Sequence, residues 1–517
     1  MTDTLRLDRS SALAQLGEVY DVLIIGGGAT GLGAAVDSAT RGYRTLLITS
    51  GDFAQATSSR STKLIHGGVR YLERGDIALV RESLHERGLL RRNAPHLVRD
   101  LRFLIPAYQW WQFGYYGGGL KIYDLLAGRL NLAPSGLAGR PGAIQLVPTI
   151  RTAGLKGGIT YSDGQFNDAR LAITLAHTAR AHGAALVNYA AVTGFQKSGG
   201  RITSALVVDE ESGREHTVRA RTVINAAGIF ADCVRRLDDP ETAPILTFSR
   251  GSHLVLDRRF LPGETALLIP RTADGRVLFV IPWEGRTMVG TTDVPADRPE
   301  PEPEPSEDEI AFLLDHVSRY LDCVPHRDDV LSTFAGLRPL VRGKTASTAR
   351  LSRDHTLLVS SSGLVTITGG KWTTYRRMAQ DAVGRAAQVA GLPARRCLTE
   401  SLRLHGADGA NPGWREFGAT DGEIAEYERR YPGELHPRLP YSLAMAAFVV
   451  DREMPVHLDD VLARRLRAAP LDARASLAAA PAVARLMARL QGHGERWASE
   501  EVERFTKLAA KYGATGR

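Results

Sequence analysis

The sequence predicts a mixed α+β and α/β fold, in which a Rossmann-type dinucleotide-binding domain is interleaved with an antiparallel-sheet domain and followed by a C-terminal helical domain. Three observations predict this architecture. A strand, a glycine turn, a helix and a second strand follow one another near the N-terminus, strand-like segments alternate with turns through the middle, and helical periodicity dominates from about residue 401. At 517 residues the chain is also too long for one ordinary core.

The N-terminal unit carries the clearest local signal. Residues 21–25 (DVLII) form a short apolar run typical of a buried parallel strand, and residues 26–31 (GGGATG) lead from it into helical sequence. A second apolar run follows at residues 45–48. The spacing G-x-G-x-x-G permits a tight turn and allows N–H groups at the start of the helix to face a pyrophosphate. The alternative, a glycine-rich turn without a ligand, is disfavoured by the flanking strand and helix.

The acidic residue that usually ends the second strand of such a unit is missing. It is expected roughly 20 residues after the glycines, near Thr49, which cannot accept hydrogen bonds as a carboxylate does. Asp52 is close enough to hold the ribose if the turn bends back. Otherwise we expect Thr49, Ser50 or water to contact the ribose hydroxyls.

The remaining elements follow in order along the chain. We expect a helix at residues 77–93, an aromatic loop at 108–123, and strands alternating with turns from 159 to about 293. An acidic, proline-rich surface loop (295–305) is followed by a helix to about Tyr320, with Ser306 and Glu309 forming its capping box. Strands return at 356–368. The C-terminal helices are expected at 421–431, 456–469 and 497–512.

Several longer motifs occur in a fixed order. They are residues 56–72 (ATSSRSTKLIHGGVRYL), 161–170 (YSDGQFNDAR), 223–228 (VINAAG), 290–293 (GTTD), 336–340 (GLRPL) and 369–375 (GGKWTTY). Together they resemble the FAD-dependent glycerol-3-phosphate dehydrogenases, most closely the mitochondrial-type and related bacterial enzymes, within the D-amino-acid-oxidase-like flavoprotein superfamily. The resemblance runs from about residue 20 to 400 and continues more loosely through the helical tail.

This resemblance implies a function and a division of the chain. The implied reaction is the oxidation of glycerol 3-phosphate to dihydroxyacetone phosphate by hydride transfer to FAD, with electrons passed to a membrane quinone. We expect residues 1–400 to hold the interleaved FAD-binding and substrate domains and residues 401–517 to form the helical domain. The FAD-binding elements are expected at about 18–75, 155–235 and 355–390, and the substrate or cap elements at about 76–154 and 236–354.

The chemistry of the residues suits a flavin. Hydroxyl and N–H groups of Thr57, Ser58 and Ser59 suit a pyrophosphate or an isoalloxazine edge, and paired glycines allow the backbone to approach a flat ring. The resemblance places residues 369–374 along the flavin pyrimidine, 191–192 by the adenine and 227–228 near the pyrophosphate. The residues expected to contact FAD are Gly26, Gly28, Ala29, Thr30, Gly31, Thr49, Ser50, Asp52, Thr57, Ser58, Ser59, Lys63, Leu64, Ile65, His66, Val192, Ala227, Gly228, Gly369, Gly370, Lys371, Thr373 and Thr374.

A phosphorylated substrate requires cations and a proton acceptor. Guanidinium and ammonium groups bind a phosphate dianion, and the alcohol proton is best taken by a base that titrates near neutrality. The expected substrate-binding residues are Arg70, Tyr71, His253, Arg338, Arg353 and Lys371. The expected catalytic residues are His66, Arg338 and His253, with His66 as the base and His253 as a substrate contact or the alternative base.

Net charge and cysteine content limit the kinds of partner and metal site that the protein is expected to have. The net charge of +8 favours anionic partners, but no basic run or aromatic-basic motif indicates nucleic acid. Cys233, Cys323 and Cys397 lack CxxC spacing, so we expect neither a disulfide framework nor a metal site. The N-terminus lacks the apolar region of a signal peptide. We expect a cytoplasmic protein that binds the inner face of the cytoplasmic membrane peripherally, and a possible homodimer.

The sequence allows more than one interpretation of the aromatic segment and of the function. The aromatic segment at 108–123 is either a membrane contact, with aromatic side chains at the headgroup level, or a buried aromatic cluster. The function also has alternatives: a glycerol-3-phosphate oxidase that uses oxygen, a flavin-dependent amino-acid or amine oxidase, and a non-enzymatic module in which the nucleotide is structural. The number of cations suited to a phosphate argues against the amine oxidase, because an amino-acid carboxylate needs one arginine.

Overall fold

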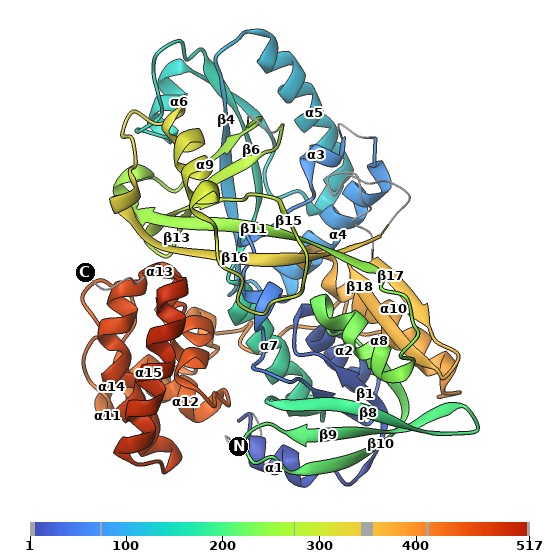
Figure 1. Cartoon of the computed structure of the whole chain (residues 1–517). Coiled ribbons are helices and arrows are strands. Elements are labelled where there is room, and N and C mark those ends of the chain that lie inside the picture. The colour runs from blue at the N-terminus through green and yellow to red at the C-terminus, as the bar shows by residue number, and fades with distance from the viewer. Residues whose placement is uncertain (1–5, 73–74, 273–274, 343–354, 410–412, 514–517) are drawn as a thin grey trace.

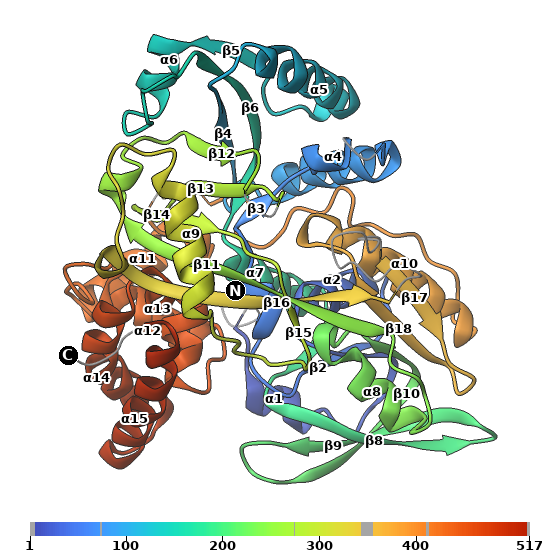
Figure 2. The ribbon, with the colours of Figure 1, turned by 45° about the horizontal axis from the view of Figure 1, so that its top comes forward.

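The computed structural model describes residues 6–72, 75–272, 275–342, 355–409 and 413–513. Two large sheets lie next to each other, and the C-terminal helices form a group beside both of them (Figures 1 and 2). The predicted combination of an α/β sheet, a second sheet and a helical C-terminal domain is confirmed. Among the described residues, no helix is both long enough and apolar enough to cross a bilayer.

The first sheet has eight strands and contains the dinucleotide-binding unit. Its main path is β17-β18-β10-β1-β2-β7, and β8 and β9 extend it from β10. The strands are β1 (Val19–Ile25), β2 (Thr45–Ile48), β7 (Ala185–Val187), β8 (Ala190–Ser198), β9 (Arg201–Asp209), β10 (Glu215–Asn225), β17 (His355–Val359) and β18 (Leu364–Gly369). Parallel β2 and β10 flank β1 on opposite sides. This arrangement is a topological switch point, where open α/β sheets bind ligands beyond the carboxyl ends of their strands.

Helices cover this sheet and bring its distant segments together. Small residues line α2 (Ala29–Thr40), which packs against α10 (Tyr375–Val389). A Cβ added at Gly33 would lie 2.8 Å from the Tyr375 ring, so the small residue permits this close approach. The other helices here are α1 (Arg9–Ala14), α7 (Asp168–Ala181) and α8 (Ala231–Asp238).

The second sheet has ten strands and is mostly antiparallel. Its main path is β15-β11-β14-β13-β12-β4-β6-β3, while β16 pairs with β11 and β5 with β6. The strands are β3 (Leu64–Ile65), β4 (Val98–Ala107), β5 (Gly136–Gly139), β6 (Gly157–Phe166), β11 (Leu246–Asp257), β12 (Ala266–Ile269), β13 (Leu278–Trp283), β14 (Arg286–Gly290), β15 (Val294–Ala296) and β16 (Val330–Val341). In Figure 2, β4 and β6 rise from the centre toward α5 (Trp111–Ala127) and α6 (Arg140–Leu146) at the top.

The helices around the second sheet include elements that local patterns predicted. Helix α4 (Ile77–Asn93) matches its predicted range, and α9 (Glu307–Ser318) begins with the predicted capping box of Ser306 and Glu309. A short helix, α3 (Val69–Leu72), forms the end of the 56–72 motif.

Two segments differ from their predicted form. Residues 157–166 were expected among the FAD-binding elements, but β6 pairs with β4 along its whole length and belongs to the second sheet. It joins the two parts of the molecule because α7, which follows it, packs on the first sheet against α2. The aromatic segment was expected as a loop, but residues 111–127 form α5. Its four glycines are unfavourable inside a helix, which makes the helical pattern hard to recognise from the sequence.

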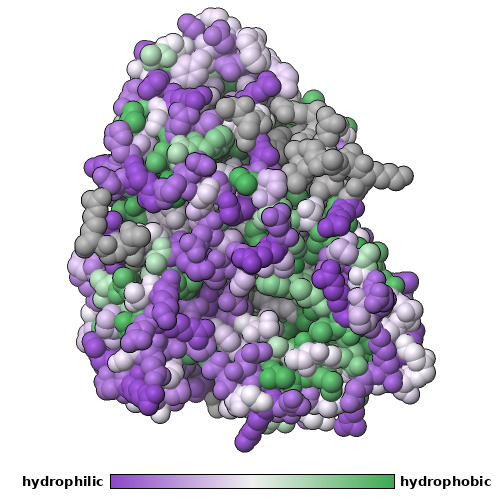
Figure 3. Space-filling view, in the orientation of Figure 1, coloured by the Kyte–Doolittle hydropathy of each residue, from purple (hydrophilic) through white to green (hydrophobic). Residues whose placement is uncertain are grey.

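The C-terminal helices form the third part of the fold. They are α11 (Asp421–Arg430), α12 (Leu443–Arg452), α13 (Ala468–Leu471), α14 (Ala473–Gln491) and α15 (Glu495–Lys511), with a π-helical turn at Asp460–Arg465. Their apolar faces share one buried cluster with the second sheet. Over this domain, the surface in the lower left of Figure 3 is mainly hydrophilic, as expected when the apolar faces point inward.

Candidate active site

A cavity of about 330 Å³ lies where the two sheets meet, and elements of both line it. It brings together residues that are far apart in the sequence and were predicted for FAD and for substrate. These are Thr57, Leu64, His66, Tyr71, His253, Arg338, Gly369, Gly370, Lys371 and Thr373. Six further side chains form an apolar part of the wall: Phe103, Ile105, Tyr116, Leu268, Val277 and Phe279.

The glycine fingerprint lies between β1 and α2, at the switch point. Only hydrogen fits at its last glycine, because a Cβ at Gly31 would lie 1.8 Å from the carbonyl oxygen of Gly26. The first residue of α2, Ala29, donates its N–H to Oγ of Ser58 at 3.0 Å, and no side chain caps the helix from Gly28. The positive end of the helix dipole therefore points to this edge. Such a terminus suits a pyrophosphate.

Other residues predicted for FAD lie along the same edge. The carbonyl oxygen of Thr49, just beyond β2, accepts the N–H of Ala190 at 2.9 Å, which places the start of β8 and its Val192 beside residues 49–50. Ala227 and Gly228 follow β10, and the Cα of Ala227 lies 2.9 Å from a Cβ added at Gly26. These contacts bring the segments predicted to hold the adenine, ribose and pyrophosphate together at one edge of the first sheet.

The structure gives Asp52 a different role from the predicted ribose contact. Its carboxylate is 1% exposed and pairs with two arginines of the C-terminal domain, Arg464 (2.6 Å) and Arg465. Both carboxylate oxygens are occupied by these guanidinium groups and by Asn188. Because both of its carboxylate oxygens already have partners, we withdraw Asp52 and retain Thr49 and Ser50 as predicted ribose contacts.

Lys63, also predicted as an FAD contact, has its side chain in a buried ion pair instead. Its ammonium is fully buried below the cavity, 2.7 Å from Asp168 Oδ2 and 2.8 Å from the Ser59 carbonyl oxygen. Burial lowers the pKa of Lys63 to about 7 although the charge of Asp168 opposes this shift. The side chain fixes residues 59–63 from below and does not line the cavity.

The long strand pair β11–β16 presents His253 and Arg338 to the cavity. Its register pairs His253 with Phe334, Gly251 with Gly336 and Ser249 with Arg338. Directly paired residues point to the same side of a sheet, and so do alternate residues of one strand. His253 and Arg338 therefore share a face, and Gly251 between them leaves room for the Arg338 guanidinium.

The imidazole of His253 is deeply buried. It stacks on Phe334 with ring centroids 4.8 Å apart, and its Nε2 lies 2.9 Å from Oγ1 of Thr62. Burial, and then the charges of Lys63 and Arg338, lower the pKa of His253 well below 6.5. The ring is therefore neutral at physiological pH and holds a proton weakly.

Arg338 has an acidic neighbour, Asp293, that was not among the predicted site residues. Asp293 lies 3.6 Å from the Arg338 guanidinium and 3.2 Å from that of Arg276, and all three residues line the cavity. Arg338 also donates to Oγ1 of Thr291 at 3.0 Å. The signal for Asp293 and Thr291 was present in the GTTD motif at 290–293, to which no role was given. Arg276 lies outside every motif.

On the opposite wall, the turn after β18 carries Lys371. Its ammonium lies 2.9 Å from Oγ of Ser83 and 4.6 Å from the centre of the Tyr71 ring. The backbone N–H of His66 lies 3.4 Å from Oγ1 of Thr373, so the two predicted flavin-contacting motifs meet here. Thr374 is buried behind them, and Ile65 is buried in β3. The side chain of Arg70 and the whole of Arg353 lie outside the described part of the chain.

Comparison with known protein families agrees with this arrangement. Residues 21–376 match the model of a family described as FAD dependent oxidoreductase, and residues 414–501 match the C-terminal domain of alpha-glycerophosphate oxidase. The chain is 40% identical to the mitochondrial glycerol-3-phosphate dehydrogenase of Rattus norvegicus over 532 aligned positions, covering 95% of this chain and 73% of the relative. It is 43% identical to the mitochondrial enzyme of Arabidopsis thaliana, covering 84% and 71%.

Solved structures show the same fold. A glycerol-3-phosphate dehydrogenase from Bacillus halodurans complexed with FAD superimposes with a TM-score of 0.78 at 27% identity, covering 98% of each chain. An L-alpha-glycerophosphate oxidase from Mycoplasma pneumoniae with FAD bound has a TM-score of 0.56 at 19% identity, covering 74% of this chain and 98% of the oxidase. The latter likeness concerns the fold alone.

Proposed function

Because this chain belongs to the family of FAD-dependent glycerol-3-phosphate dehydrogenases, we propose that it oxidises glycerol 3-phosphate to dihydroxyacetone phosphate and passes the electrons to a membrane quinone. It is an FAD-dependent oxidoreductase. The observation that carries the choice of substrate is the cavity itself, where cations from both walls and two histidines border the glycine turn at 369–370.

The cations account for recognition of the phosphate. Arg276 and Arg338 approach from the second sheet with Asp293 beside both guanidinium groups, and Lys371 approaches from the first sheet. Guanidinium forks and an ammonium together satisfy a dianion that one arginine would leave only partly neutralised. This argues for a phosphorylated alcohol over an amino acid as substrate.

The two histidines have different tasks in the proposed reaction. FAD, when bound, accepts the hydride from the carbinol carbon, and the hydroxyl proton must go to a base. A base whose pKa is far below the working pH accepts protons poorly. Since burial and two cations lower the pKa of His253 in this way, we assign His66 as the base and His253 as a contact that orients the substrate hydroxyl.

Helix α5 supports the proposed membrane association. It and its flanks expose large apolar side chains at Trp110 (70% exposed), Trp111 (61%), Tyr115 (56%) and Leu125 (80%). The same helix contributes Tyr116 to the cavity wall. An exposed aromatic face of this kind suits the headgroup level of a bilayer. We therefore propose that α5 lies on the inner face of the cytoplasmic membrane and that a quinone meets the flavin near it. Dimerisation stays a prediction.

The function is tested by mixing the purified holoenzyme with glycerol 3-phosphate in the absence of air. We expect the flavin absorbance to bleach and to recover rapidly when a quinone analogue is added, but slowly in air. An Arg338→Met variant should require much more substrate to bleach.

The other outcomes separate the alternatives. Rapid recovery in air with release of peroxide would replace the dehydrogenase by an oxidase. Absence of bleaching with glycerol 3-phosphate, in protein that contains FAD, would overturn the substrate.

A further inference from the structure

A short run of the C-terminal domain reaches the loops that frame the cofactor site. Arg464, Arg465 and Arg467 are each at most 2% exposed. Charged side chains are seldom buried so completely unless they are paired. Each of these three contacts a loop predicted from the sequence to border FAD, although none of them lines the cavity.

The first contact is with residues 49–52, the ribose loop. Oδ2 of Asp52 accepts hydrogen bonds from Nε of Arg464 at 2.6 Å and from Arg465, and Oδ1 accepts a further bond from Arg465 at 2.8 Å. Two guanidinium groups therefore hold one carboxylate, which fixes its position and orientation. Thr49 and Ser50, the predicted ribose contacts, lie three and two residues earlier on the same loop.

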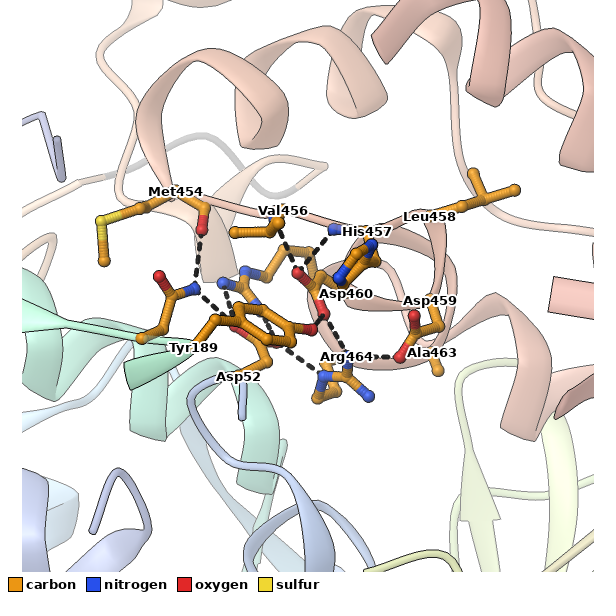
Figure 4. Close-up of polar contacts among 12 residues, drawn as sticks. Asp52, Tyr189, Met454, Val456, His457, Leu458, Asp459, Asp460, Ala463 and Arg464 are labelled. Carbon is orange, nitrogen blue, oxygen red and sulfur yellow. Dashed lines mark hydrogen bonds and ion pairs between the residues drawn. The ribbon is translucent and has the colours of Figure 1, made fainter. Parts of the chain in front are cut away.

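The second contact is with the turn that precedes the adenine strand, β8. The hydroxyl of Tyr189 donates to Oδ1 of Asp460 at 2.6 Å, and Asp460 is itself held by the N–H groups of Val456 and His457. Figure 4 shows Asp52 and Tyr189 side by side, facing Asp460 and Arg464. The ribose loop and the turn before the adenine strand therefore contact the same short segment of the C-terminal domain, residues 460–465.

The third contact is with the turn at Ala56–Ser59. Arg467 donates to the carbonyl oxygen of Ser59 at 2.6 Å, the oxygen that Lys63 also contacts. Ser58, one residue earlier, accepts the first N–H of helix α2. Arg467 has a φ of +61°, a region that residues other than glycine rarely adopt. Surrounding contacts must hold it there.

We propose that Arg464, Arg465 and Arg467 are positioning residues for FAD. They hold Asp52 and Ser59 so that the ribose loop and the 56–59 turn keep the arrangement that receives the cofactor, and they take no part in hydride or proton transfer. Because linkage is reciprocal, bound FAD should in turn stabilise the docking of residues 453–467 on the first sheet.

The direct test is the affinity of apoenzyme for FAD. In Asp52→Asn, which keeps the side-chain shape but removes its charge, we expect the dissociation constant for FAD to rise about tenfold or more. With FAD at saturation, kcat and KM for glycerol 3-phosphate should stay within about twofold of wild type, since no substrate contact changes. Arg465→Lys keeps the charge but loses the two-pronged contact, and should give a smaller rise.

Arg286→Gln is the control. Arg286 of β14 donates to the carbonyl oxygen of Arg438 at 2.6 Å, where the C-terminal domain meets the second sheet, and its described hydrogen-bond partners include no residue of 49–52, 56–59 or 453–467. This variant should weaken that contact, lower Tm slightly and leave the FAD dissociation constant unchanged. If Asp52→Asn and Arg465→Lys also lower Tm without changing that constant, the arginines are structural only and the proposal is overturned.

Hydrogen exchange gives a second readout that needs no variant. We expect amides of residues 453–467 to exchange faster in wild-type protein stripped of FAD than in holoenzyme, while the centre of α14 changes little. Equal exchange at 453–467 in both forms would contradict the coupling. This measurement also decides the matter if Asp52→Asn does not fold.

Discussion

Gly31 illustrates how one missing methyl group can determine whether a cofactor site exists. A Cβ there would overlap the carbonyl oxygen of Gly26, a backbone atom that cannot move without opening the turn. We expect Gly31→Ala to fold but to purify without FAD, with loss of flavin absorbance and activity. Gly384→Ala in α10, where a Cβ would meet nothing within 4 Å, is the matched control and should retain FAD. Full flavin content in Gly31→Ala would exclude this turn as the pyrophosphate site.

The two histidines are separable by the pH dependence of their variants. A histidine base loses activity on the acid side, because its protonated form cannot accept a proton. The pKa of His253 lies well below 6.5, so its protonation should not affect rates near neutrality. We expect His66→Asn to lower kcat by about 10²- to 10⁴-fold and to remove the acidic decline in kcat. His253→Asn should mainly raise KM and keep that decline. If His253→Asn removes the decline instead, His253 is the base.

The role of a single residue could be predicted from the sequence where it depends only on residues close to it in the chain. The glycine fingerprint could be identified because its function depends on six consecutive positions. The role of Asp52 could not, because its partners lie 412 and 413 residues further along the chain. Lys63 was misassigned for the same reason: its motif was recognised, but the buried partner Asp168 that turns it away from the cavity was not visible from local sequence.

At the scale of elements, α5 is the segment whose sequence was hardest to interpret. Its three consecutive glycines, Gly117 to Gly119, disfavour a helix in isolation. In the structure the helix is supported by tertiary contacts of Leu120, Tyr123 and Ala127, which are buried. Trp110 and Trp111 are exposed, which argues against a buried aromatic cluster at these two residues, and the membrane contact stays a proposal.

The exposed face of α5 provides a test of membrane association. Replacing Trp110 and Trp111 together with serine removes two large apolar side chains that are mostly exposed. We expect the double variant to cosediment much less with anionic vesicles and to lose activity with a membrane quinone. Activity with a water-soluble acceptor should be unchanged, because neither tryptophan lines the cavity. Vesicle binding equal to that of wild type would show that α5 is not the contact.

The ranges of the longer helices could be predicted from sequence pattern more readily than the pairing of the strands. The capping box of α9 and the range of α4 were correct, because both depend on neighbours within a few turns. The pairing of β6 with β4 was missed because a strand pattern does not state which sheet it joins.

At the scale of the whole molecule, the contact between the C-terminal domain and the second sheet brings together two carboxyl groups, those of Glu416 and Glu284. Burial, and then the nearby charge of Glu284, raise the pKa of Glu416 to about 7, although Asn167 donates to it at 2.8 Å. A carboxyl whose folded pKa exceeds its unfolded value contributes stability below the unfolded pKa, near 4.5, and loses it as pH rises through the folded pKa. Between pH 4.5 and about 7 this pair should therefore destabilise the fold increasingly.

Glu416→Gln tests this dependence. We expect the variant to be more stable than wild type at pH 8 by roughly 1 to 3 kcal/mol and nearly equal at pH 5. The measurement is the free energy of unfolding at both pH values, or Tm if unfolding is irreversible. Glu284→Gln is the companion variant and should give a change of the same sign. A difference from wild type that does not vary with pH would contradict the assignment.

The order of the strands in the first sheet also bears on how the chain is made. β1 pairs with β10, and β10 pairs with β18. Residue 24 therefore cannot pair with residue 224, nor residue 224 with residue 365, until the later residue has been synthesised. At ribosomal speeds of about 5–20 residues per second, the apolar strand β1 emerges roughly 20 to 70 seconds before the sheet can close. β2 can pair with one edge of β1 early, but the other edge stays unpaired until β10 is made, and an unpaired strand edge is prone to aggregate. The nascent chain should therefore depend on holding chaperones until synthesis passes residue 370, and recombinant yield should improve when translation is coupled to their supply.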